Sequence, residues 1–151
     1  MKADAQKYMA AALVQISVAV FEGEPMDYQK YRHTSLFFEF ANREPSFLAH
    51  VIGPPEEYEF QTRDGYDPSQ SQSIAKIVKV GVSLVEVRRA QMIELLRTIP
   101  VKNWDLEFNC QIWVETALKR LSELRMLSED AYTKGVDGMV DAIAEAADEE
   151  D

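Results

Sequence analysis

The sequence predicts an α+β domain in which an antiparallel β-sheet of about four to five strands packs against helices. Alternating apolar and polar residues dominate the first 82 positions, whereas apolar residues recur at helical spacing in the remainder. Strands that precede helices in this way are typical of the α+β class. The length of 151 residues and the hydrophobic content of 46% favour a single domain, residues 1–151, with a substantial core.

The strands are predicted from alternating, β-branched stretches separated by turn residues. They are residues 13–21, 31–40, 46–52 and 74–82, with a further short strand at 57–61 and a loose arm at about residues 1–10. In the second strand the even positions, which include Leu36 and Phe38, form the better core face, and the odd positions, which begin with His33, are mixed. We expect the second and third strands to form a hairpin. Residues 62–73 are polar and turn-rich, which predicts a loop.

The helices are predicted from apolar residues three and four positions apart. They are residues 88–98, a helix that runs from Cys110 through Leu124, and a last helical region that opens at residues 128–130. Gly135 and Gly138 are expected to interrupt this last region, because glycine disfavours a helix. An acidic tail at about residues 145–151 is expected to be solvated.

Composition excludes several classes of protein. The formal net charge of −10 argues against a nucleic-acid partner, which would require a basic surface. No stretch approaches the roughly 20 apolar residues of a membrane-spanning helix, so no integral membrane segment is expected. The single cysteine excludes an internal disulfide and favours a reducing compartment, and we therefore expect a cytoplasmic protein.

Cys110 is the main chemical signal in the sequence. It follows Asn109, a candidate helix cap, and a helix start stabilises a thiolate through free backbone N–H groups. A cysteine nucleophile also requires a base, and the base requires a group that orients it. The two histidines, His33 and His50, lie on the expected hairpin and provide candidates for both roles. The backbone N–H of Cys110 is placed to stabilise an oxyanion.

Other interpretations of these residues remain open at this point. A lone helical cysteine is more often an inert apolar residue, and a histidine in a strand is more often structural. A zinc site formed by Cys110, His33 and His50 has suitable ligand types but lacks the close pairs of typical zinc motifs. We expect no metal and no cofactor. Trp104 and Trp113 flank the cysteine and are either core residues or walls of a substrate pocket.

Three short motifs resemble a known superfamily. Residues 33–38 read His-Thr-Ser-Leu-Phe-Phe, His50 lies four positions before Pro54, and residues 109–114 read Asn-Cys-Gln-Ile-Trp-Val. This order of motifs resembles the circularly permuted papain-like thiol hydrolases and acyltransferases of the lecithin–retinol acyltransferase type. The whole chain also resembles uncharacterised small proteins of filamentous fungi, a resemblance that implies no function.

The superfamily resemblance implies Cys110 as nucleophile, His33 as base and His50 as its orienting partner. The implied activity is hydrolysis or acyl transfer at an amide, isopeptide or ester bond through an acyl-thioester, with a small-molecule or peptide/protein acyl substrate. Thr34 stands where the superfamily often has an aromatic residue, and with Asn109 and the two tryptophans it completes the expected pocket. The alternative is a non-catalytic protein-interaction module that retains the fold. The sequence indicates no oligomeric state.

Overall fold

The computed structural model describes residues 10–148 of the chain. The predicted N-terminal arm, apart from Ala10, and the last three residues of the predicted acidic tail lie outside the described residues. The regular elements, in chain order, are β1 (Val14–Phe21), η1 (Gln29–Tyr31), β2 (His33–Phe40), β3 (Phe47–Ile52), β4 (Glu59–Asp64), η2 (Pro68–Gln70), β5 (Ile74–Val82), α2 (Arg89–Arg97), α3 (Cys110–Glu123) and α4 (Glu129–Ala144).

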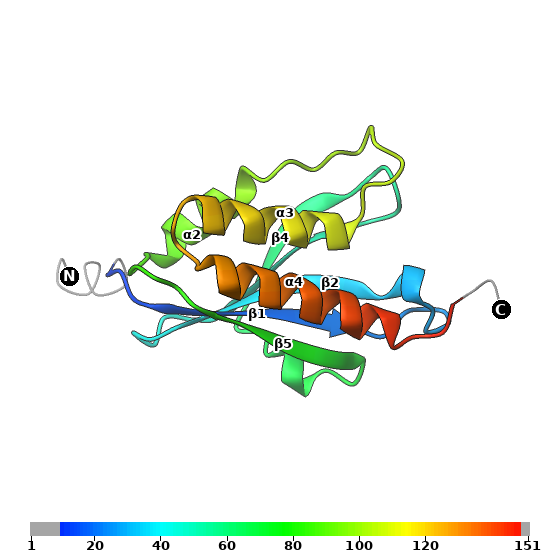
Figure 1. Cartoon of the computed structure of the whole chain (residues 1–151), viewed down its shortest axis with the longest axis horizontal. Helices are drawn as coiled ribbons and strands as arrows, with labels where there is room; N and C mark the ends of the chain where they lie inside the picture. Colours follow the sequence, from blue (N-terminus) through cyan, green and yellow to red (C-terminus); the bar gives the residue numbers. More distant parts are fainter. Residues whose placement is uncertain (1–9, 149–151) are drawn as a thin grey trace.

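The five strands form one antiparallel sheet with the order β4-β3-β2-β1-β5. Helices α3 and α4 lie side by side across the sheet (Figure 1), so the prediction of an α+β fold with an antiparallel sheet of about four to five strands is confirmed. The predicted hairpin is formed by β2 and β3, which pair from Leu36 with Ala49 to Phe38 with Phe47. The strands carry no further paired positions toward the end that holds His33 and His50.

The two faces of the sheet differ in what covers them. Side chains such as Ile16, Phe38 and Ala49 point toward the helices and form the main core, so we call this the helix face. The other face, which we call the open face, carries a smaller cluster centred on Phe37 and Leu48. The even positions of β2 therefore face the main core, as the alternation predicted.

Helix α4 is continuous from Glu129 to Ala144, and the predicted interruption at Gly135 and Gly138 is wrong. A Cβ atom at Gly135 would lie 2.8 Å from a methyl carbon of Val80, and one at Gly138 would lie 2.5 Å from a methyl carbon of Val78. The two glycines thus permit α4 to approach β5 closely. Ser128 caps this helix by accepting a hydrogen bond from the Ala131 N–H at 3.0 Å.

The predicted loop at residues 62–73 begins later than expected, because β4 extends to Asp64. The pairing of β4 with β3 continues to the start of β3, where Phe47 lies opposite Asp64. Arg89, the first residue of α2, forms an ion pair with Asp64 and donates a hydrogen bond to the carbonyl of Pro45. The first contact connects the end of β4 to α2, and the second connects the turn before β3 to the same helix.

The described part of the predicted acidic tail is held against the rest of the domain. The backbone N–H of Gln29 donates to the carbonyl of Ala147 at 3.0 Å, and the Gln29 side chain donates to the carbonyl of Ala146. The guanidinium of Arg32 connects Asp27 with the carbonyl of Ala142 in α4. The segment that leads into β2 is therefore fixed to the C-terminal end of α4.

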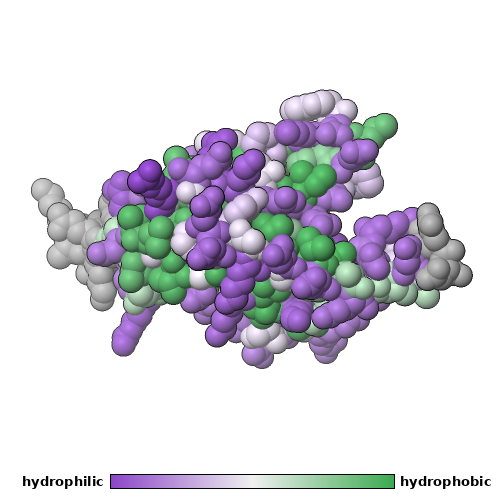
Figure 2. Space-filling view, in the orientation of Figure 1, coloured by the Kyte–Doolittle hydropathy of each residue, from purple (hydrophilic) through white to green (hydrophobic). Residues whose placement is uncertain are grey.

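The outer surface of the helices is mainly hydrophilic, with smaller hydrophobic areas between the charged side chains (Figure 2). No helix among residues 10–148 is long and apolar enough to cross a membrane.

Candidate binding site

His33 and His50 are hydrogen-bonded to each other on the open face. The Nε2 atom of His33 lies 3.0 Å from the Nδ1 atom of His50. His33 is the first residue of β2, and His50 lies in the second half of β3. Strand alternation places both on the side opposite Phe38 and Ala49, and the Phe21 ring packs beside His33. The hairpin of β2 and β3 therefore brings the two imidazoles within hydrogen-bonding distance.

Burial keeps both imidazoles neutral. Burial lowers the pKa of His33 below its ordinary value. Burial, followed by the charges of His33 and Arg63, lowers the pKa of His50 to about 4. At neutral pH one imidazole therefore donates to the other, and neither carries a charge. The Nε2 atom of His50 is buried and has no hydrogen-bond partner among residues 10–148.

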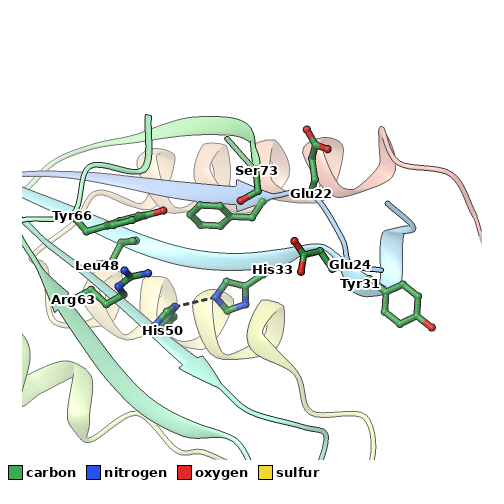
Figure 3. Close-up of a pocket in the computed structure, with 10 residues that line it drawn as sticks. Glu22, Glu24, Tyr31, His33, Leu48, His50, Arg63, Tyr66 and Ser73 are labelled. Carbon is green, nitrogen blue, oxygen red and sulfur yellow. Dashed lines mark hydrogen bonds between the residues drawn. The ribbon is translucent and has the colours of Figure 1, made fainter. Parts of the chain in front are cut away.

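The histidine pair lies in a pocket with a volume of about 330 Å³. Figure 3 shows His33 and His50 side by side, with Arg63 and Leu48 toward one end and Glu22 and Glu24 toward the other. The lining residues come from four strands and the segments that follow them; they are Phe21, Glu22, Glu24, Tyr31, His33, Leu48, His50, Arg63, Tyr66 and Ser73. A volume at the low end of the range for ligand pockets fits a small molecule or a single side chain.

Arg63 and Tyr66 form the wall beside Leu48. The guanidinium carbon of Arg63 lies 4.3 Å from the centre of the Tyr66 ring. No described carboxylate forms an ion pair with Arg63. A stacked guanidinium keeps its N–H groups in a planar fork that matches a carboxylate. The pocket therefore holds a positioned cation without a protein counter-ion among the described residues.

Cys110 belongs to the other side of the sheet. It is the first residue of α3, is half-buried, and packs against the core of the helix face. Its Sγ atom lies 4.0 Å from the carbonyl oxygen of Arg32. Burial and, after it, the electrostatic interaction with Cys110 raise the pKa of Tyr58. The structure thus brings His33 and His50 together, while Cys110 does not line their pocket.

The four residues expected around the nucleophile lie outside the pocket as well. Thr34 is fully buried, and its even position in β2 directs it to the helix face. Trp113 is fully buried in the main core. Asn109 caps α3 by accepting a hydrogen bond from the Ile112 N–H at 3.0 Å. Trp104 is 78% exposed and contributes to neither the core nor the pocket.

The loop that carries Trp104 is anchored to the domain. The side chain of Asn103 accepts a hydrogen bond from the Tyr58 N–H at 2.9 Å and donates one to the Tyr58 carbonyl at 3.0 Å. Phe108 is buried, and its ring contacts the Tyr58 ring edge to face. Asn103 therefore has a structural role in positioning the segment before Cys110.

Sequence reasoning missed most of the pocket. Arg63 and Tyr66 fall in the stretch that the sequence predicts to be a polar loop, where single charged residues carry no distinguishing signal. Leu48 had a usable signal, because it alternates with Phe47 and Ala49 and shares a face with His50. Among residues 10–148, no group of three or more His, Cys, Asp or Glu side chains is arranged to hold a metal ion.

The fold and the site define a small α+β domain with a pocket on the sheet face that its helices leave uncovered. The chain belongs to the family described as a family of unknown function (DUF6540), whose model matches residues 19–128, more than half of its length. The matched range contains both histidines, Arg63 and Cys110. No curated protein and no solved structure matches the chain.

Proposed function

We propose that this protein is a non-catalytic binding module whose ligand, a small molecule or part of a peptide, enters the pocket on the open face. The observation that carries the proposal is the neutral His33–His50 pair in a pocket of about 330 Å³, beside the guanidinium of Arg63, which forms no ion pair with a described carboxylate. Neutral imidazoles provide hydrogen bonds without a charge, and Phe21 and Leu48 provide apolar contact. A cytoplasmic location is part of the proposal, in keeping with a single cysteine.

The first prediction concerns the position of binding. Two-dimensional NMR of the ¹⁵N-labelled full chain is recorded while a mixture of small polar and aromatic fragments is added. We expect shift changes at the backbone amides of Leu48, His50 and Tyr66, because these residues line the pocket. Leu48→Glu is expected to abolish the shifts, with circular dichroism to verify that this variant is folded, and Ile112→Glu, at a more exposed position on α3, serves as the control for an added carboxylate.

Two results would contradict this proposal. One is the absence of any shift at the pocket amides with all fragments. The other is a set of shifts that gathers at the start of α3 and leaves the pocket unchanged.

The second candidate function is the cysteine-nucleophile hydrolase or acyltransferase, related to the permuted papain-like superfamily. The observation that favours it is the approach of the Cys110 thiol to the Arg32 carbonyl, one residue before His33. The paired positions of β2 and β3 end at Leu36 and Ala49, so no ladder pairing joins the two strands at the end that carries the histidines. For this chemistry the His33 ring has to reach the thiol, with His50 as the partner that orients it through their hydrogen bond. Its signature is alkylation of Cys110 that depends on His33.

A further inference from the structure

The two ends of the pocket carry opposite charges. Glu22 and Glu24 follow β1, and Arg63 lies on β4. Neither glutamate forms an ion pair with a described residue. Figure 3 shows the two carboxylates on one side of the histidine pair and the guanidinium on the other. Glu22 also interacts electrostatically with Arg32, but no ion pair with a described residue neutralises either end of the pocket.

The distance between these ends sets the length of a matching ligand. β1 and β4 are separated by β2 and β3 in the sheet, and three strand spacings amount to about 14 Å. The side chains of Arg63 and the glutamates shorten this span from both ends. A ligand whose two charges are joined by several bonds of about 1.5 Å each fits the remainder, whereas one with adjacent charges does not.

The middle of the pocket is apolar and neutral. The histidine pair occupies it, burial suppresses protonation of both imidazoles, and Phe21 and Leu48 add apolar surface to the pocket. A charged centre in a ligand would be poorly solvated here, whereas a chain of methylene groups would gain contact with the Phe21 ring and the Leu48 methyl groups.

We propose that the pocket binds an extended zwitterion, in which a primary ammonium group and a carboxylate are joined by an apolar stem. The carboxylate accepts hydrogen bonds from the fork of Arg63, which its stacking on Tyr66 holds in place. The ammonium group lies between Glu22 and Glu24 and close to the Phe21 ring. A free ω-amino acid and a peptide that ends in lysine share this chemistry. The inference rests on the proposed binding function of the same pocket.

The second prediction tests this ligand class with three probes of one length: 6-aminohexanoate, hexanoate and hexylamine. Binding to the full chain is measured by NMR titration of the pocket amides. We expect 6-aminohexanoate to bind at least about tenfold more tightly than either singly charged probe, because only it satisfies both ends. A peptide with a C-terminal lysine and its C-terminal amide form distinguish a peptide ligand from a free amino acid.

Two variants assign the ends of the ligand. Arg63→Gln is expected to weaken 6-aminohexanoate and hexanoate by about tenfold and to leave hexylamine unchanged. The double variant Glu22→Gln, Glu24→Gln is expected to weaken 6-aminohexanoate and hexylamine and to leave hexanoate unchanged. Arg97→Gln is the matched control, because Arg97 also lies over an aromatic ring, that of Phe60, outside the pocket.

Equal affinity for the three probes, or affinities that Arg63→Gln leaves unchanged, would overturn the ligand class. If other fragments change the chemical shifts of the pocket amides while 6-aminohexanoate does not, the inferred ligand class is wrong and the proposed binding function stands. If no fragment or probe shifts these amides, both fail.

Discussion

At His50, burial and a hydrogen bond act on the same ring. The side chain is 7% exposed, its Nδ1 atom forms a hydrogen bond with His33, and its Nε2 atom has no partner in the described part of the chain. An unpaired buried N–H costs more than an unpaired lone pair, which favours the tautomer in which Nδ1–H of His50 donates to His33. The Nδ1 atom of His33 then carries the remaining proton. This arrangement gives the pocket one donor without a charge.

The third prediction is a loss of stability in mild acid. The folded state lowers the pKa of His50 from its ordinary value of 6.5 to about 4, so the unfolded chain takes up the proton first. The stabilisation is complete above pH 6.5 and is lost as the pH falls toward 4. At about 1.4 kcal/mol for each tenfold change in proton affinity, the loss is on the order of 3 kcal/mol.

Urea unfolding between pH 7 and pH 4 measures this loss. His50→Gln is the informative variant, since it removes the titrating ring, and its unfolding free energy is expected to depend less steeply on pH. Asp27, whose pKa Arg32 lowers from 3.8 to about 2, contributes mainly below this range. The assignment to His50 is wrong if the variant and the natural sequence show the same slope.

Among the elements, α3 shows how a site signal in sequence can have a structural cause. In the sequence, Asn109 and Cys110 are a polar residue and a thiol at a predicted helix start, a pattern that is typical of a reactive cysteine. In the structure, Asn109 accepts the Ile112 N–H and so satisfies one of the free donors of the first turn. In the helix that follows, buried residues such as Trp113, Val114 and Ala117 recur at helical spacing. Asn109 is accounted for by capping alone.

The fourth prediction concerns this cap. Asn109→Ala is expected to lower the free energy of unfolding by about 1 kcal/mol, because it removes the side-chain acceptor. Ser128→Ala at the start of α4 is the matched comparison, with the same kind of hydrogen bond at the same distance. Thermal and chemical unfolding measure both. Asn109→Ser is expected to recover most of the loss, and a serine variant no more stable than the alanine variant would contradict the capping role.

The alternation in β2 and β3 also contained the information that separates the histidines from Cys110. The pattern that turns Phe38 toward the core turns His33 to the opposite face, and Phe47 and Ala49 do the same for His50. A helix that covers the core face brings its first residue to that same face. The positions of the strands and the start of α3 were predictable. The order of the motifs, however, predicts one site formed by His33, His50 and Cys110 and takes no account of the sheet face on which each residue lies.

Over the whole molecule, local patterns predicted the elements well and their long-range contacts poorly. The α+β class, the antiparallel sheet and the start of α3 follow from periodicity and caps. The continuity of α4 through Gly135 and Gly138 did not follow, because it depends on the methyl groups of β5 that face those glycines. The pocket could not be predicted from local patterns either. Arg63 and Glu24 are far apart in the sequence, and they line one cavity only because the sheet brings β4 and the segment after β1 together.

The net charge of −10 also constrains the ligand at this scale. A chain with this charge repels anions at long range, and salt screens that effect beyond about 8 Å at physiological ionic strength. A ligand that carries a positive group together with its carboxylate avoids this repulsion. The charge of the whole chain and the polarity of its pocket therefore favour the same class of ligand.

The central claim is that the His33–His50 pair works apart from the Cys110 thiol, and the rate of Cys110 alkylation by iodoacetamide at pH 6 tests it most directly. The rate is compared between the natural sequence and His33→Gln, with circular dichroism to verify that both are folded. We predict equal rates, because the imidazoles lie on the open face and the thiol packs on the helix face. A fall of roughly 100-fold in His33→Gln would identify His33 as the base for Cys110 and contradict the account.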